Sequence, residues 1–370
     1  MQKDIEELES LSVEDRKRLA ISGLELDYLN RCGSFFQIDQ EIVHMSCEYE
    51  GIEVLTLEGA LAKHEWMEQY YWKLVQKDRD EYTRFVADQE HPKGYVVIAK
   101  KGSKNILPLQ TCLFLAHESI QHVHNIIIAE EGAELHLITG CASSASTEHG
   151  AHYGVTEFYV GKNARISTTM IHTWGENIEV YPRSAAKIEE NGTFLSNYVA
   201  MSPVKNVQMY PVAELVGEHA VARFNSVVVA MPGSCLDLGS RAILSANNTS
   251  AELISRAITR GGTVIARAHI LGEVEDTRGH IECKGLILED GIIHAVPEIE
   301  GWVTGTELSH EAAVGKIAHE EIEYLMSRGL DEDEATATII RGFLDVKIEG
   351  LPEMLQKQID AAIDAAESGF

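Results

Sequence analysis

Tyr95-Val-Val-Ile-Ala99 is the first of a series of short apolar segments that continues as far as Gly301. Others in the series are Asn125-Ile-Ile-Ile-Ala129, Glu134-Leu-His-Leu-Ile-Thr139, Val227-Val-Val-Ala-Met231 and Thr263-Val-Ile-Ala-Arg267. The segments favour β-branched residues and are punctuated by glycine, asparagine or charged residues, which is typical of β-strands. Residues 95–301 are therefore predicted to form a β core.

Glycine recurs at turn-like positions through this core, often at intervals of roughly twenty to thirty residues, the length of one solenoid turn. The positions are Gly132, Gly161, Gly192, Gly217, Gly239, Gly261, Gly262, Gly272, Gly279 and Gly291. A β-sandwich would also fit the strand pattern. The core is long for a single sandwich, however, and it has one Asn-Gly hairpin signal, at Asn191-Gly192. A parallel β-helix is therefore the favoured architecture.

Residues 1–94 are predicted to be mostly helical, with short strands as an alternative around residues 42–49. Ser12-Val-Glu-Asp15 resembles a capping box that opens a helix. The segment from Lys63 to Val75 places aromatic and apolar residues at helical spacing, which predicts an amphipathic helix. Such an aromatic face is typical of a packing surface.

Residues 302–370 are predicted to be helical, beginning near Ser309. Gly329 is a suitable C-terminal stop, and Asp331 opens the next helix. Pro352 suits the first turn of a last helix. So small a bundle buries little apolar surface by itself, so we expect it to pack on the end of the solenoid or on a partner.

The composition excludes several classes of protein. The 370 residues are 45% hydrophobic and 24% charged, as in soluble globular proteins. No apolar run is long enough to span a membrane, and the N-terminus lacks a signal-peptide core, so the cytoplasm is the expected location. The net charge of −27 disfavours nucleic acid and anionic membranes as partners. It fits a saline cytoplasm equally well.

Residues that could react or bind a metal are scattered along the chain. The six cysteines contain no Cys-x-x-Cys pair, so each is either a buried apolar residue or a reactive thiol. Cys141, Cys235 and Cys283 are the candidates for thiolate chemistry. His122 and His124 would share one face of a strand, where they either bind a metal or face water. His310-Glu311 is either functional or an exposed pair at a helix start.

The absence of certain motifs narrows the function. The chain has no P-loop, so it is not expected to hydrolyse a nucleotide in a site of that kind. A carbohydrate-active β-helix enzyme with paired carboxylates is one alternative. Such enzymes usually need a groove lined with aromatic residues, whereas aromatics make up 7% of this chain. They concentrate in residues 28–95, which counts against that alternative.

Longer blocks resemble a known family. They are Asn247-Asn-Thr-Ser-Ala-Glu-Leu-Ile-Ser-Arg256, Gly279-His-Ile-Glu-Cys283 and Glu307-Leu-Ser-His-Glu-Ala-Ala-Val-Gly-Lys-Ile317. Together with Glu134-Leu-His-Leu-Ile-Thr-Gly-Cys141, they resemble the SufB/SufD family of iron–sulfur cluster assembly proteins. The resemblance extends over residues 65–345.

The resemblance implies a mainly β fold, a right-handed parallel β-helix flanked by helical N- and C-terminal domains. The corresponding ranges are residues 1–94, 95–301 and 302–370. It also implies a scaffold that is not itself an enzyme and that carries a transient iron–sulfur cluster. The last β-helix strands would join a homodimer or a SufB–SufD-type heterodimer, and the C-terminal helices would bind a SufC-like ABC ATPase. The sulfur donor stays open. Flavin binding is doubtful, because the long N-terminal extension of bacterial SufB is missing.

The resemblance also suggests site residues, one at a time. Cys141 matches the cysteine that receives sulfur in SufB. Glu311, His310 and Cys283 match family positions near the nascent cluster. The SufB cluster-building cysteine has no counterpart between Glu289 and Pro297.

Because this cysteine is missing, other ligands must be considered. Cys283, Cys235, His294 or Asp290 would take its place, or the chain is a SufD-like partner without its own cluster. Imidazole and carboxylate ligands hold a cluster more loosely than thiolates do, which suits a scaffold that must release its product.

Overall fold

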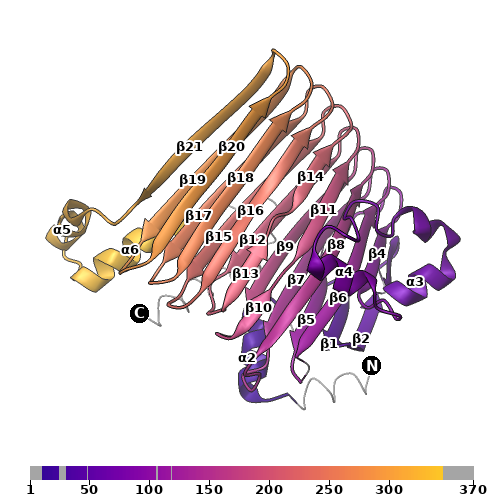
Figure 1. Cartoon of the computed structure of the whole chain (residues 1–370), viewed down its shortest axis with the longest axis horizontal. Coiled ribbons are helices and arrows are strands. Elements are labelled where there is room, and N and C mark those ends of the chain that lie inside the picture. Colours follow the sequence, from indigo (N-terminus) through magenta and orange to yellow (C-terminus); the bar gives the residue numbers. More distant parts are fainter. Residues whose placement is uncertain (1–10, 25–30, 48, 106, 118, 345–370) are drawn as a thin grey trace.

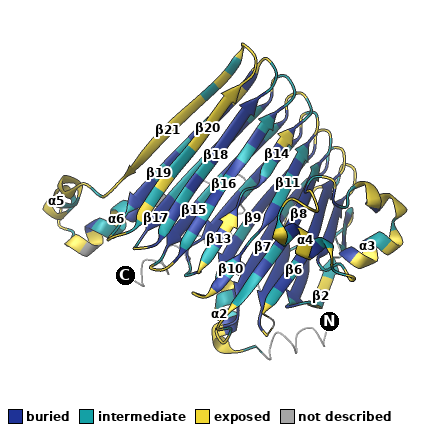
Figure 2. Cartoon of the chain, viewed as in Figure 1, coloured by how far each residue is buried: buried dark blue, intermediate teal, exposed yellow. Residues whose placement is uncertain are grey.

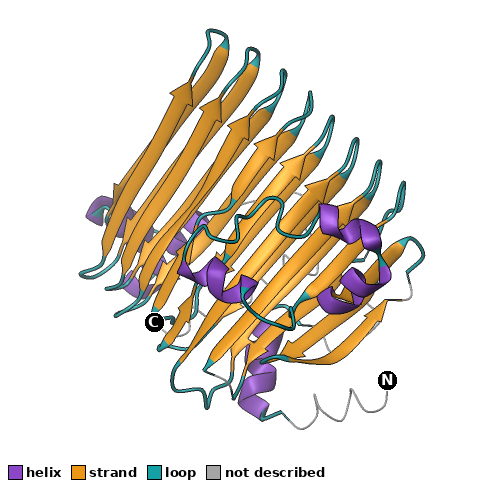
Figure 3. Ribbon diagram, turned by 45° about the vertical axis from the view of Figure 1, so that its right-hand side comes forward, coloured by secondary structure: helices purple, strands orange, loops and turns teal. Residues whose placement is uncertain are grey.

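The chain folds into a β-solenoid whose two long sheets face one another (Figures 1 and 3). The computed structural model describes residues 11–24, 31–47, 49–105, 107–117 and 119–344. The ten-stranded sheet has the order β2 (Glu41–Cys47), β1 (Gly33–Ile38), β5 (Leu109–Leu115), β7 (Glu134–Ser143), β9 (Arg165–Thr173), β12 (Thr193–Ala200), β15 (Val221–Ala230), β17 (Ser250–Thr259), β19 (Thr277–Ile287) and β21 (Thr306–Gly315). We call it sheet A.

The eleven-stranded sheet, sheet B, forms the opposite wall. Its strands are β3 (Ile52–Thr56), β4 (Tyr95–Ala99), β6 (Ile120–Ala129), β8 (Gly150–Val160), β10 (Ile178–Val180), β11 (Arg183–Ile188), β13 (Asn206–Met209), β14 (Val212–Leu215), β16 (Cys235–Leu244), β18 (Thr263–Gly272) and β20 (Ile292–Gly301). From β4 onwards the ladders within both sheets are parallel. The predicted β-solenoid is therefore confirmed in its architecture.

Side chains alternate along each strand between the interior and the outer face. In β16, for example, every second residue from Leu236 to Leu244 is buried. The inward residues of both sheets form one continuous apolar core. Whether a residue lies at an inward or an outward position therefore decides which site it can join.

Residues with a left-handed backbone mark successive turns at one edge of the solenoid. Asn163, Asn191, His219, Asn248 and Asp276 all have positive φ and recur every 28 or 29 residues. Asparagine and aspartate tolerate this conformation better than most residues. The predicted spacing of one turn was sound, but asparagine, aspartate and histidine mark it as much as glycine does.

The N-terminal region is less helical than predicted. Helices α2 (Val13–Ile21), α3 (Leu57–Lys63) and α4 (Glu81–Ala87) alternate with strands, and β1, β2 and β3 extend the two sheets. Ser12 caps α2 by accepting a hydrogen bond from the Asp15 backbone N–H, as expected.

The predicted helix from Lys63 to Val75 is wrong. Only a 3₁₀-helix, η2 (Glu65–Gln69), forms there. The backbone N–H groups of Trp72, Leu74 and Val75 donate instead to the buried carboxylate of Glu157. A long-range hydrogen-bond acceptor therefore replaces the helical ladder.

The predicted start of helix near Ser309 is also wrong. β21 continues the solenoid and pairs with β19 from Thr306 to Gly315. Helices α5 (His319–Ser327) and α6 (Glu332–Leu344) follow. Ile340 and Phe343 of α6 pack on the outer face of sheet A, and not on the end of the solenoid as predicted. The helix predicted after Pro352 lies outside the described residues.

The solenoid is closed at its N-terminal end and open at its C-terminal end. Figure 2 shows β20 and β21 as largely exposed, in contrast to the buried strands behind them. Among the helices of the described residues, none is long and apolar enough to cross a membrane.

Candidate functional site

Cys141 lies inside the solenoid, on the inward face of β7. It belongs to the main core and is 1% exposed. Burial raises the pKa of the Cys141 thiol well above its ordinary value. The side chain is therefore a protonated thiol at neutral pH, which is a weak nucleophile unless another group removes the proton.

Cys283 and His310 share the interior face at the open end. Cys283 on β19 is in register with Ser255 on β17 and with Ala312 on β21. His310 on β21 is in register with Ile281, so it lies two positions along the same face from the Cys283 rung. Cys283 is 2% exposed and burial raises the pKa of its thiol, whereas His310 is exposed because no described strand covers β21.

Glu311 faces the opposite way, on the outer surface of sheet A. There it meets His280 and Glu282 of β19, and one ligand atom from each of the three lies within 4.8 Å of the others. Lys284 Nζ lies 3.4 Å from a carboxylate oxygen of Glu282 and 3.4 Å from one of Glu311. A divalent cation would suit this donor set but would have to displace Lys284.

Neighbouring cations keep the Glu282 carboxylate ionised. Partial burial raises the pKa of Glu282, but hydrogen bonds and charge from Arg256 and Lys284 outweigh that effect and lower the pKa overall. Neither His280 nor Glu282 is among the site residues predicted from the sequence. Their two-residue spacing on a strand in register with Glu311 is the signal that would have identified them.

Cys235 and His294 do not join Cys283. Cys235 begins β16 beside the buried Leu236, so it points to the outer face of sheet B. His294 on β20 is exposed and in register with the outward-facing Ile265. Asp290 lies exposed in the turn before β20. Apart from Asp290, the six predicted residues are therefore distributed over the interior and the outer faces of sheets A and B.

His122 and His124 do not converge on a metal. Both lie on the outer face of β6, but His124 Nε2 is 2.9 Å from a carboxylate oxygen of the buried Glu157. The ring of His122 instead contacts Phe85. His124 therefore supports Glu157, which binds the segment 72–75, and His122 packs against α4.

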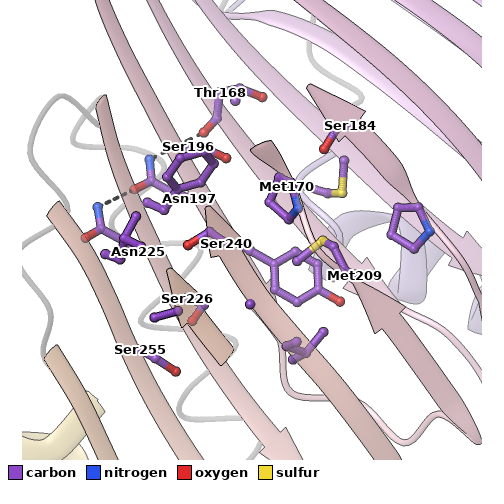
Figure 4. Close-up of a pocket in the computed structure, with 18 of the residues that line it drawn as sticks. Thr168, Met170, Ser184, Ser196, Asn197, Met209, Asn225, Ser226, Ser240 and Ser255 are labelled. Carbon is purple, nitrogen blue, oxygen red and sulfur yellow. Dashed lines mark hydrogen bonds between the residues drawn. The ribbon is translucent and has the colours of Figure 1, made fainter. Parts of the chain in front are cut away.

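Two adjoining cavities occupy the interior. The smaller, of about 20 Å³, is lined by Cys141, Thr139, His152 and His172 among others. The larger, of about 70 Å³, extends to Ser255 and Ala268 (Figure 4). Their shared lining residues are Thr156, Phe158, Thr168, Met170 and Pro182. Since about 10–15 Å³ suffices for a water molecule, both cavities can hold small polar species.

Polar side chains line the larger cavity along its length. Figure 4 shows hydroxyl groups from both sheets around it; they belong to Ser184, Ser196, Ser226, Ser240 and Ser255. Sheet B is interrupted beside this space, where Pro182 separates β10 from β11 and Pro211 separates β13 from β14. Proline cannot donate a hydrogen bond to the ladder.

The cavities lead from Cys141 towards Cys283. Thr139, Met170, Tyr198, Ser226, Ser255 and Cys283 are consecutive register partners across sheet A. Cys141 and Cys283 are five strands apart, or about 24 Å at the usual spacing between strands. The larger cavity ends at Ser255, one strand before Cys283.

The family model described as "SUF system FeS cluster assembly, SufBD core domain" matches residues 113–343. The chain belongs to the SufBD family. A protein named as an iron–sulfur cluster assembly SufBD family protein from Archaeoglobus fulgidus is 51% identical over 95% of each chain. One of the same name from Methanothermobacter thermautotrophicus is 44% identical over 94% of this chain and 86% of that protein. A relative from Pyrococcus horikoshii is 31% identical over 95% and 80%.

The matched SufBD core runs from β5 into α6 and contains every candidate site residue. It also contains all the residues that line the two interior cavities except Tyr95, which lines the smaller one. Family membership confirms the resemblance on which the site was predicted, and it gives no support to the carbohydrate-active alternative. The roles of individual residues do not follow from membership alone.

Proposed function

We propose that this chain is a scaffold subunit of a SUF-type system, in which Cys141 receives sulfur and an iron–sulfur cluster is built at the open end of the solenoid. The cluster is cargo, assembled and then released. The scaffold carries out no ATP hydrolysis itself. Sulfur would move through the interior cavities from Cys141 towards Cys283.

The observation that carries this proposal is the chain of cavities between the two thiols. No cysteine other than Cys141 lines either cavity. Cys32 and Cys47 lie at the N-terminal end of the core, Cys235 faces outwards and Cys112 belongs to a separate cluster under α2. Two thiols about 24 Å apart cannot exchange sulfur by direct contact. A passage lined with hydroxyl groups supplies a route for a small sulfur species.

Ligands for the cargo gather at the open end. Cys283 and His310 supply a thiol and an imidazole on the interior face, whereas the Glu311 carboxylate lies on the outer face of the same strand as His310 and would bind separately from them. This set contains fewer thiolates than the four that usually hold a cluster, which favours release. Cys235 and His294 lie apart, and they would contribute only through a second subunit.

A second subunit is the natural cover for this end. Within the described residues, β20 pairs only with β18 and β21 only with β19, so both strands present an unpaired edge. Exposed edges of this length are templates for pairing with another chain. We propose that a second copy, or a SufD-like paralogue, joins here and completes the site.

A SufC-like ABC ATPase is the proposed partner of the C-terminal helices. None of the residues of α5, a helix that is described throughout, is buried, and Tyr324 and Met326 are exposed at 59% and 43%. Tyr324 lines a shallow groove between α5 and α6. Because α6 packs on sheet A, motion of these helices would be transmitted to the open end.

Ser255→Leu tests the passage. The larger side chain would fill the space next to Cys283, while Glu252→Leu changes the outer face of the same strand and serves as control. After anaerobic assembly with iron and a sulfur donor, we expect Ser255→Leu to load sulfur on Cys141 but to retain little iron and sulfide. Equal iron and sulfide in Ser255→Leu, Glu252→Leu and wild type would contradict the passage.

The second candidate function is a SufD-like structural partner without its own cluster. The absence of a cysteine between Glu289 and Pro297 favours it. Anaerobic co-purification with the ATPase separates the two: iron and acid-labile sulfide in stoichiometric amounts support the scaffold, and an ATPase complex without iron supports the structural partner.

A further inference from the structure

Two buried histidines share the smaller cavity with Cys141. His152 on β8 and His172 on β9 are each 3% exposed, and both line this cavity. His172 is the register partner of Cys141, and both lie on the inward face of sheet A. Neighbouring strands are about 4.8 Å apart, so the thiol and the imidazole leave the sheet side by side.

Gln121 fixes the protonation of His152. The Gln121 side-chain N–H₂ donates to the backbone carbonyls of Asp39 and Phe114, at 3.0 and 3.1 Å. Its amide oxygen therefore faces His152 Nδ1, at 2.9 Å. A carbonyl oxygen only accepts, so Nδ1 carries the proton and Nε2 keeps its lone pair.

The lone pair of His152 is directed at the cavity. A Cβ atom built on Gly154, which lines the cavity, would lie only 2.9 Å from His152 Nε2. The glycine therefore leaves room beside this nitrogen. Nε2 is in position to accept a proton from a group inside the cavity.

His172 has the opposite tautomer. The Tyr198 hydroxyl lies 2.9 Å from His172 Nδ1, and this is its only hydrogen bond within the described residues. A buried phenol normally donates its proton, so Nδ1 of His172 is the acceptor and Nε2 carries the hydrogen. One imidazole thus offers a base and the other a hydrogen-bond donor.

We propose that Cys141, His152 and His172 form a buried sulfur-accepting site in which His152 takes the thiol proton and His172 donates a hydrogen bond to the reacting sulfur. This inference rests on the proposed function, because it assumes that Cys141 accepts sulfur. The sulfur arrives as a persulfide, R–S–S–H. Tyr198 and Gln121 are positioning residues, since each acts through a histidine.

The transfer is balanced in atoms and electrons. A bond forms between Cys141 Sγ and the outer sulfur of the persulfide, and the S–S bond of the donor breaks. The electron pair leaves on the donor sulfur as a thiolate, which recovers a proton from His152. The products are a Cys141 persulfide and R–S–H, without net oxidation. Once R–S–H has left, the cavity of about 20 Å³ has room for the one sulfur atom that Cys141 has gained.

The surroundings keep all three groups neutral before reaction. Burial lowers the pKa of His152 to about 3 and lowers that of His172 well below its ordinary value. His122 from β6 adds a smaller lowering of the His152 pKa, and Tyr95 from β4 has a pKa raised by burial to about 12. Neither a carboxylate nor an ammonium group is among the cavity's described lining residues. Proton transfer must therefore accompany formation of the S–S bond.

The experiment measures the rate at which Cys141 gains one sulfur atom from cysteine hydropersulfide. The full chain is used, and mass spectrometry follows the Cys141 peptide between pH 6 and 9. For the wild type we expect a rate nearly independent of pH, because no free thiolate forms. In His152→Gln we expect a rate lower by about 100-fold at pH 7, typical of a lost general base, which recovers as pH rises.

Matched variants separate chemistry from folding. His136→Gln changes the outer face of the same strand as Cys141, and we expect it to behave as wild type. His172→Phe keeps an aromatic ring, and we expect it to slow transfer at every pH while leaving the profile flat. The melting temperature of each variant is measured alongside.

The outcomes distinguish the proposed role of the two histidines from the proposed role of Cys141 as the sulfur acceptor. A wild-type rate and pH profile in both His152→Gln and His172→Phe would overturn the assignment of the histidines and leave Cys141 as the acceptor. A wild-type Cys141 that gains no sulfur, from the persulfide or during assembly, would overturn the proposed function as well.

Discussion

The two ends of the solenoid differ in how completely the chain covers them. At the N-terminal end, antiparallel β2 closes sheet A and antiparallel β3 closes sheet B. Phe35 is fully buried behind this cover. β2 and β3 are the outermost strands there, as β21 and β20 are at the C-terminal end. The two ends differ in burial, because β20 and β21 are mostly exposed, including the apolar residues Ile292, Ile299 and Val314. Solenoids need a cap at each end, and the part of this chain that the structure describes provides one only at the N-terminal end.

The difference in burial between the two ends indicates where the proposed cluster site lies. A closed end protects the buried thiol and imidazoles around Cys141 from solvent. The open end exposes His310 on the interior face near the buried Cys283 and Glu311 on the outer face of sheet A, and we propose that a partner covers its unpaired strands. On the proposed function, a dry site that accepts sulfur is thus separated from an open site where the cargo is built.

The largest expected effect is at the closed end, in Glu157→Ala. The carboxylate accepts hydrogen bonds from three backbone N–H groups and from His124. Its removal leaves buried donors unpaired, which should cost about 3–5 kcal/mol of unfolding free energy. Urea denaturation measures this. Glu190→Ala, which breaks an exposed pair with Lys162, should cost at most about 1 kcal/mol. Equal effects of the two changes would refute this account of the closed end.

At the open end, Ile299→Asp combined with Val314→Asp should weaken self-association. Both side chains are apolar and exposed at the unpaired strands, at 40% and 42%. Burying two carboxylates in an interface should raise the dissociation constant by at least about 100-fold. Light scattering after gel filtration should show the 40.9 kDa monomer. Val13→Asp at the closed end, 76% exposed, is the control and should leave the mass of the assembly unchanged.

Acid should destabilise the closed end through its buried histidines. Burial lowers the pKa of His152 to about 3 in the folded chain, against about 6.5 when unfolded. Below pH 6.5 the unfolded state therefore binds a proton at His152 and the folded state does not. The free energy of unfolding falls as the pH falls. The loss from His152 should reach about 2 kcal/mol at pH 5.

Denaturation curves at pH 7.5 and pH 5 measure this pH dependence. In His152→Gln the difference between the two should shrink by that amount, whereas His319→Gln on the exposed face of α5 should leave it unchanged. A pH dependence identical in His152→Gln and wild type would show that this histidine is not held neutral by the fold.

The comparison also shows what the sequence can predict. Alternating apolar segments were sufficient for the solenoid, because each strand buries one face. The segment Thr306–Gly315 contains two alanines and two glutamates, which favour helices, so local preference predicts the start of a helix there. Pairing with β19 over ten positions overrides that local preference. Similarly, the carboxylate of Glu157 replaces a helix that the spacing of aromatic residues had predicted after Lys63.

The arrangement of the site depended on the same pairing. His310 and Glu311 are adjacent in sequence, yet on a strand they face opposite sides, so only one can share the interior with Cys283. His280 and Glu282 come next to Glu311 only through the register of β19 with β21. The neighbourhood of Cys141 and His172 likewise needs the β7–β9 register, which no short motif encodes.

The central claim is that sulfur passes through the interior from Cys141 to the open end. The most direct test supplies isotopically labelled sulfur during anaerobic assembly and quantifies label on Cys141 in wild type and in Cys283→Ala. The account predicts that label accumulates as a Cys141 persulfide in Cys283→Ala while iron and sulfide at the open end are lost. Normal cluster formation in Cys283→Ala, with Cys141 unlabelled throughout, would contradict it.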